Sequence, residues 1–285
     1  MVLKNALFCL VFAVSFAGSA QNKMPYQIFT KSGKITTYNQ MVDAATQNEV
    51  ILFGEHHDNS IIHWLQLEFT KDLSTKSALV LGAEMIEADN QMQLDQYLNG
   101  EINQQAFDTL ARLWNNHKTD YKPLVDFAKQ RKMRFIATNV PRRYARMVYR
   151  GGFEALDTLT ANEKKWIAPM PFSYDSNLPG YRKMVEEMGG HGGENLPKAQ
   201  AIKDATMAHF ITENMKKDSI FVHYNGTYHS DFHEGIFWYL KSSLPRLKIL
   251  TIATVSQSDV SSLEIEHLNK ADFIIVTDDD VTKTY

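Results

Sequence analysis

Two segments of the chain share one spacing, a glycine followed three residues later by a histidine. The first pair is Gly54 and His57, and the second is Gly226 and His229. Glycine permits a sharp exit from a strand and a close approach of another backbone. A histidine at or near a helix start meets the positive end of the helix, which disfavours the imidazolium. We therefore expect two neutral imidazoles, each able to act as a base or as a metal ligand.

Carboxylate and guanidinium groups accompany the two histidines. Two imidazoles with Glu55 or Glu84 make a nitrogen and oxygen set of the kind that zinc accepts, and the predicted metal ligands are His57, His229 and Glu84. Alternatively, the same groups activate water for hydrolysis, with an arginine stabilising an anion. The candidate catalytic residues of such a hydrolase are Glu55, His57, Glu84, Arg142 and His229.

Each of these side chains, taken alone, is better explained as a partner for the backbone groups of a turn. Their concentration at strand ends is what favours a functional site over that structural role. His56 and His57 are adjacent and cannot both face one centre in an extended loop, so we expect His57 to be the functional one. His223 is open to both interpretations, as a hydrogen-bonded core histidine or as part of the site.

The elements that position these residues follow from the hydrophobic pattern. Short aliphatic and β-branched runs predict buried strands at 50–53, 78–81, 134–137, 220–223, 249–253 and 273–276. Helix-period segments lie between them, the clearest with apolar residues at 62, 65, 69 and 73, and another with residues 107, 110 and 114 on one face. This alternation predicts an α/β fold with a mostly parallel, doubly wound sheet, whose strand ends meet at one edge.

Residues 153–217 are too long for an ordinary crossover between two strands. We therefore expect a single domain over residues 21–285 that contains a helical insertion at about 153–217, acting as a lid or a small domain.

The first twenty residues predict a signal peptide. Lys4 supplies the positive start, residues 6–16 the apolar stretch, and residues 18–20 the small side chains before a cut at Gln21. We therefore expect an exported protein, periplasmic or secreted. Cys9 is the only cysteine and lies inside the apolar stretch, so no lipidation cysteine follows that stretch and the mature chain has no disulfide. The net charge of −3 argues against a nucleic-acid partner.

Four stretches together resemble a known family. They are 51–59 (ILFGEHHDN), 82–85 (GAEM), 139–146 (NVPRRYAR) and 225–229 (NGTYH). In this order they are similar to the ChaN-like haem-binding proteins of the TraB/Tiki superfamily, whose shared marks are two glycine-x-x-histidine motifs, a glutamate and an arginine. The resemblance implies a parallel-sheet fold with a smaller helical part, haem binding, and a role in iron acquisition with envelope uptake proteins.

Haem needs a large apolar slot and an axial ligand from His, Tyr, Met or Cys. The predicted insertion offers such side chains, and the resemblance favours tyrosine ligation. The candidate haem-binding residues are Tyr174, Tyr181, Met188 and His191. The alternative for this segment is an ordinary amphipathic lid whose apolar residues face the core. A second copy of the chain would help to enclose the porphyrin as a homodimer.

The sequence is therefore compatible with three functions. A haem-binding protein is preferred to an enzyme, a metal-dependent or general-base hydrolase is the second choice, and a non-catalytic scaffold is the third. The strand-end residues serve the first two equally, since a fold alone does not decide a function.

Overall fold

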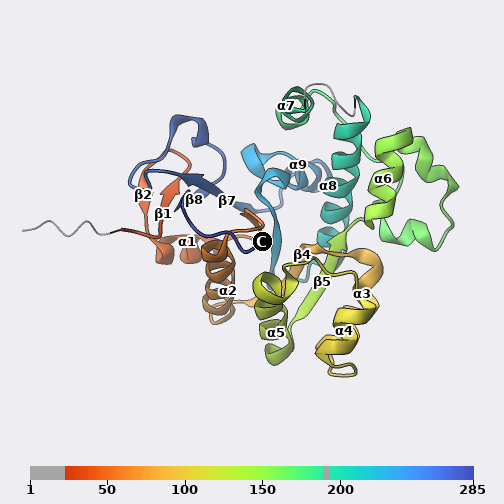
Figure 1. Cartoon of the computed structure of the whole chain (residues 1–285), viewed down its shortest axis with the longest axis horizontal. Coiled ribbons are helices and arrows are strands. Elements are labelled where there is room, and N and C mark those ends of the chain that lie inside the picture. Colours follow the sequence, from red (N-terminus) through yellow and green to blue (C-terminus); the bar gives the residue numbers. More distant parts are fainter. Residues whose placement is uncertain (1–22, 189–192) are drawn as a thin grey trace, which may run out of the picture.

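The fold is described from a computed structural model of the chain, which covers residues 23–188 and 193–285 (Figure 1). The predicted signal peptide at residues 1–20 lies outside the described residues, and so does His191. In the part of the chain that the structure covers, no helix is both long and apolar enough to cross a membrane.

One mixed sheet runs through the molecule. Its strands are β1 (Tyr26–Thr30), β2 (Ile35–Thr36), β3 (Val50–Glu55), β4 (Ala78–Glu87), β5 (Arg134–Asn139), β6 (Ser219–Gly226), β7 (Ile249–Gln257) and β8 (Phe273–Asp278). The strand order is β2-β1-β8-β7-β3-β6-β4-β5. All neighbouring strands from β8 to β5 are parallel, and only β1 pairs antiparallel with its two neighbours.

Helices cover both faces of this sheet. They are α1 (Tyr38–Ala45), α2 (Ser60–Ser74), α3 (Gln91–Leu98), α4 (Gln104–Leu110), α5 (Lys122–Arg131), α6 (Arg142–Gly151), α7 (Pro179–Glu187), α8 (Asn195–Asn214) and α9 (Ile236–Ser243). Short helical turns are η1 (Ala88–Asn90), η2 (His117–Tyr121), η3 (Phe153–Thr158), η4 (Glu163–Trp166), η5 (Thr227–His229), η6 (Asp231–His233) and η7 (Ile265–His267).

The two faces of the sheet carry separate cores. Alternate residues of β3 make this clear: Ile51 and Phe53 pack with α1, α2 and α5, whereas Val50 and Leu52 pack with α8 and α9. Figure 1 shows α2 and α5 below the sheet and α8 and α9 above it. Because each central strand is buried on both faces, its sequence is a continuous apolar run, which is the signal from which it was predicted.

The predicted α/β fold with a mostly parallel sheet is confirmed, and the six predicted strands correspond to β3 to β8. The sequence did not predict β1 and β2, which form an antiparallel extension beside β8. The strands also continue further than predicted, because β4 runs on to Glu87 and β6 to Gly226. Glu84 therefore lies within β4, at an irregularity where the regular pairing with β5 is interrupted.

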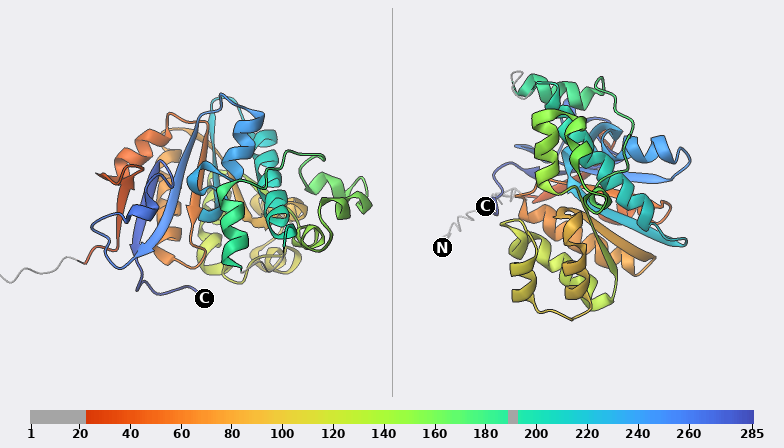
Figure 2. Two further views of the ribbon diagram at one scale, coloured as in Figure 1. Left: turned by 90° about the horizontal axis from the view of Figure 1, so that it is seen from above. Right: turned by 90° about the vertical axis from the view of Figure 1, so that its right-hand side faces the viewer.

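The segment predicted as an insertion is divided in two by the structure. Its last helix, α8, supplies Ala205 and Ile211 to the core that covers β3 and β4, so it belongs to the sheet-covering layer. The part before α8 packs mainly on α6, through Leu156 and Ile167. Figure 2 shows the segment after α6 projecting at one end of the molecule.

Strands β3 and β6 are neighbours, and both glycine-x-x-histidine motifs begin at their ends. A Cβ on Gly54 would lie 2.8 Å from Cα of Thr227, and a Cβ on Gly226 would lie 2.8 Å from Nε2 of His57. Each glycine thus makes room for the residues that follow the other glycine. This reciprocal close approach explains in physical terms why both motifs begin with glycine.

We predict that Gly54→Ala lowers the free energy of unfolding by about 1–3 kcal/mol, because the added methyl group meets backbone that cannot rotate away. The matched control is Gly151→Ala at the end of α6, where the new Cβ would lie 3.3 Å from Cβ of Ala155. Its effect should stay within about 0.5 kcal/mol. Urea denaturation measures both changes, and equal losses for the two variants would contradict the packing argument.

Candidate functional site

Glu55, the last residue of β3, is completely enclosed and is surrounded by hydrogen-bond donors. His57 Nδ1 lies 2.8 Å from Glu55 Oε1, and the Tyr121 hydroxyl donates to the same oxygen over 2.7 Å. Gln66 of α2 donates to Oε2, also over 2.7 Å. Burial raises the pKa of a carboxyl group, but the hydrogen bonds from His57 and Tyr121 and the charges of His57 and His63 together outweigh burial here and lower the pKa of Glu55. Glu55 is therefore an anion that holds the His57 ring in one orientation.

Glu84 forms a second buried acid and histidine pair beside the first. Its Oε2 accepts the backbone N–H of Gly226 at 2.7 Å, and its Oε1 lies 3.1 Å from Nε2 of His229. The other ring nitrogen of His229, Nδ1, bonds to Asp204 of α8. Asp204 in turn accepts the Tyr181 hydroxyl of α7 at 3.0 Å. A continuous chain of polar contacts thus links α7 to the end of β6.

The charges of this second pair follow from its surroundings. Burial alone would lower the pKa of His229, yet the neighbouring carboxylates Glu84 and Asp204 raise it to about 9. Burial likewise opposes ionisation of Glu84, but His229 holds its pKa far below the usual range. Burial raises the pKa of Asp204 in spite of His229. Glu84 is therefore the principal counter-ion of an imidazolium at His229.

The expectation of a neutral imidazole is therefore wrong for His229. For His57 burial again favours the neutral ring, but the bond to Glu55 and the charge of Glu84 raise its pKa above the usual value. For His229 the reason is that Glu84 of β4 and Asp204 of α8 outweigh any effect of the short helical turn η5. His57 still differs from His229, because its side chain is 31% exposed and that of His229 only 6%.

The predicted zinc site is not supported by this geometry. Both ring nitrogens of His229 lie against carboxylates, those of Glu84 and Asp204, and neither faces an open ligand position. Within residues 23–188 and 193–285, the one group that brings three ligand atoms within 4.8 Å of each other is Glu264, Glu266 and His267 at η7. That group lies at the surface, where acidic side chains commonly gather without a metal, and His57, Glu84 and His229 do not converge in this way.

The remaining predicted strand-end residues take other positions. Arg142 is exposed at the start of α6 and makes no side-chain hydrogen bond or ion pair among the described residues. His56 lies apart from the cluster, with its Nδ1 3.4 Å from the Ser256 hydroxyl. His223 is a core histidine: it is fully buried, bonds to Thr138 and Asn225, and burial lowers its pKa to about 4.

Sequence reasoning missed Asp204, Gln66 and Tyr121, although two of them carry a recognisable signal. Asp204 lies one turn from the buried Ala201 and Ala208 of α8. Gln66 lies one turn from the buried Ile62 and Phe69 of α2, so each lies on the buried apolar face of its helix. A polar side chain on such a face must find a buried partner, which points to a polar site beneath the helix. Tyr121 offers no comparable signal, because tyrosines are common in cores.

The candidate haem ligands are distributed along the segment that contains α7. Tyr181 is buried and its hydroxyl is engaged by Asp204. Tyr174 is half-buried, with its ring 5.3 Å from Phe153 and 5.9 Å from Tyr181. Met188 is exposed at the end of α7. His191 lies outside the described residues. Of the three described candidates, Tyr174 and Met188 are open to a ligand from solvent.

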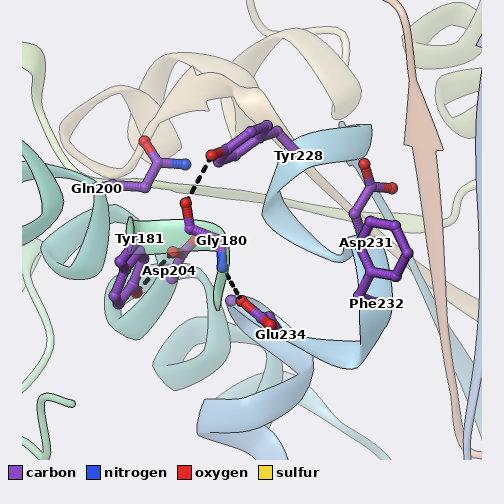
Figure 3. Close-up of a pocket in the computed structure, with 9 residues that line it drawn as sticks. Gly180, Tyr181, Gln200, Asp204, Tyr228, Asp231, Phe232 and Glu234 are labelled. Carbon is purple, nitrogen blue, oxygen red and sulfur yellow. Dashed lines mark hydrogen bonds between the residues drawn. The ribbon is translucent and has the colours of Figure 1, made fainter. Parts of the chain in front are cut away.

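A small pocket lies where α7 meets η5 and η6. Figure 3 shows Gly180 held there by two bonds, because its N–H donates to Glu234 and its carbonyl accepts the Tyr228 hydroxyl, each over 2.7 Å. The pocket also reaches Tyr181 and Asp204, and its volume is about 30 Å³, which is room for one water molecule. With α7 in this position, a porphyrin has no access to Tyr181.

Comparison with known proteins supports the fold described above. The structure of ChaN of Campylobacter jejuni, reported with cofacial haem binding, matches with a TM-score of 0.67 and 17% identity, over 88% of this chain and 96% of that one. A Bacillus cereus protein matches with a TM-score of 0.53 and 11% identity, over 88% and 94% of the two chains. No curated protein matches the sequence.

The family model described as haem-binding uptake, Tiki superfamily, ChaN matches residues 41–240. This range includes β3 to β6, both glycine-x-x-histidine motifs, Asp204 and the whole α7 segment. The chain therefore belongs to the ChaN haem-binding uptake family of the Tiki superfamily.

Proposed function

We propose that this chain is an exported haem-binding protein that takes part in haem or iron acquisition at the cell envelope. The observation that carries the proposal is the match of the ChaN haem-binding uptake family over residues 41–240. The signal-peptide pattern of residues 1–20 supports export. Haem and proteins of envelope iron uptake are the partners that this function requires.

The surface around α7 offers side chains suited to a porphyrin. Tyr228, Phe232 and Met188 are all exposed, and the first two line the small pocket beside Gly180. Aromatic and thioether groups make favourable contacts with a flat apolar ring system, and a phenol is an axial ligand for haem iron. We propose that haem lies against this surface, with Tyr174 or Tyr228 within reach of iron and a second copy of the chain covering the other side.

Titration of the purified mature protein with hemin tests the proposal. We expect a saturable Soret band at micromolar hemin. Replacing the axial ligand should weaken binding by about tenfold or more, as loss of groups that hold a metal commonly does. The variants are Tyr174→Phe, Tyr228→Phe, Tyr181→Phe and His191→Ala, each of which removes one ligand atom.

The control for these variants is Tyr26→Phe on β1, whose ring contacts Trp64 at the other end of the sheet. It should bind hemin as the parent chain does. A chain that shows no Soret band with micromolar hemin, or a loss as large for Tyr26→Phe as for the other variants, would overturn the proposal.

General-base hydrolysis is the second candidate function, and one observation favours it. Glu55 fixes His57 through Nδ1 at 2.8 Å, while the His57 side chain keeps 31% of its surface exposed. His57 Nε2 faces Gly226 and makes no hydrogen bond among the described residues. A histidine that a buried carboxylate orients in this way can activate water or a hydroxyl nucleophile. The enclosed His229 has no such freedom, because both of its nitrogens are occupied.

If the chain hydrolyses esters or peptides, His57→Ala should reduce turnover of a model ester by about a hundredfold or more. A base acts only when unprotonated, and the pKa of His57 is raised, so turnover should increase with pH through a limb above 6.5. Glu55→Gln removes the carboxylate that raises this pKa and should shift the limb to lower pH. His56→Ala is the control, since His56 faces Ser256 instead of the cluster. Unchanged turnover in His57→Ala would exclude this function.

A further inference from the structure

Helix α6 carries three arginines on one face. Arg142, Arg146 and Arg150 are spaced by four residues and are all exposed, so they form a row about 12 Å long. We call these three residues the arginine stripe. The opposite face of the helix, with Tyr144 and Val148, is buried in the protein core. The helix is therefore anchored by its apolar side and presents the stripe outwards.

The stripe has no internal counter-charge. Among the described residues, none of its three arginines forms an ion pair or a side-chain hydrogen bond. The fourth arginine of α6, Arg143, does have such partners. It bonds to Asp89 over 2.7 Å and lies over the Tyr144 ring at 4.5 Å. A structural role thus explains Arg143, whereas it leaves the stripe unexplained.

Positive charge is concentrated around the stripe although the chain as a whole carries −3. Residues 142–166 contain six basic and three acidic side chains. The exposed Lys164 and Lys165 belong to η4, which adjoins α6 because Arg143 lies 5.6 Å from the Trp166 ring. Figures 1 and 2 show α6 and the segment after it together at one end of the molecule.

The shape and composition of this surface indicate what kind of partner it fits. Small ligands bind in concave sites, and neither of the two pockets described for the molecule is lined by α6. Protein interfaces depend on buried apolar or aromatic anchors, but the apolar side of α6 is already covered and only Tyr149 is exposed beside the stripe. An anionic lipid surface needs neither a cavity nor an anchor, and a tyrosine suits the headgroup level.

We propose that the arginine stripe, with Lys164 and Lys165, docks the protein on anionic phospholipid headgroups. Charge complementarity carries this assignment: an unpaired row of guanidinium groups on a helix that lies along the surface meets a plane of phosphates. Each basic residue near such a surface is worth about fivefold in partitioning. Five of them suffice for reversible attachment that salt weakens.

Sedimentation with vesicles tests the proposal on the full mature chain. Vesicles of phosphatidylcholine with about one third phosphatidylglycerol should carry the protein down at low salt, and vesicles of phosphatidylcholine alone should not. Arg146→Gln together with Arg150→Gln should reduce partitioning about thirtyfold, since two basic contributions are lost. Raising the salt to 0.5 M should release the parent chain.

The matched control is Lys34→Gln with Lys217→Gln, which removes the same charge at two exposed positions away from α6. This variant should partition as the parent chain does, and circular dichroism verifies that both variants are folded. Equal losses in the two variants would reduce the effect to net charge and overturn the proposal. Sedimentation that is independent of phosphatidylglycerol would also overturn the proposal. So would a chain that binds none of the vesicles but binds an acidic protein through α6.

Discussion

Two carboxylates, Glu55 at the end of β3 and Glu84 within β4, are buried on either side of β6, and the surrounding side chains supply their hydrogen bonds and counter-charges. An unpaired buried carboxylate costs several kcal/mol, so each requires cationic and hydrogen-bonding partners. Glu55 obtains three donors from the β3–α2 loop, η2 and α2, and Glu84 obtains the Gly226 amide and His229. The β3–α2 loop, α2, η2 and the end of β6 all contribute, so the cluster ties these elements to the ends of β3 and β4.

The glycines of the two motifs are also needed to bring the partners of these buried carboxylates close together. A side chain at Gly226 would occupy the space of the His57 ring, and one at Gly54 would push against Thr227. The ends of β3 and β6 approach closely, and this places His57 of the first acid and histidine pair near Glu84 of the second. The His57 pKa depends on Glu84 as well as on Glu55. One pair cannot be altered without a change in the electrostatics of the other.

The sequence predicted most of the sheet and only part of the site. The buried strands were readable because double burial makes them continuously apolar, whereas the short β1 and β2 lack that signal. Trp114 was expected on a helix face with Phe107, but α4 ends at Leu110. The ring of Trp114 instead lies 4.8 Å from the ring of His57. The protonation of His229 could not be inferred, since the position of Asp204 on α8 indicates a buried polar partner but not that this partner is His229.

Asp204 connects the two parts of the molecule to which function is assigned. It accepts Tyr181 from α7 and His229 from the strand-end cluster, so both depend on one carboxylate. If α7 moves to bring Tyr181 to a haem iron, Asp204 loses a donor while it is still buried, at a cost of about 1–3 kcal/mol. The interaction with haem must offset that cost, or water must replace the phenol. A ligand held by exposed groups, such as Tyr228, avoids this cost and leaves the cluster intact. The state of the strand-end histidines is therefore coupled to the position of α7.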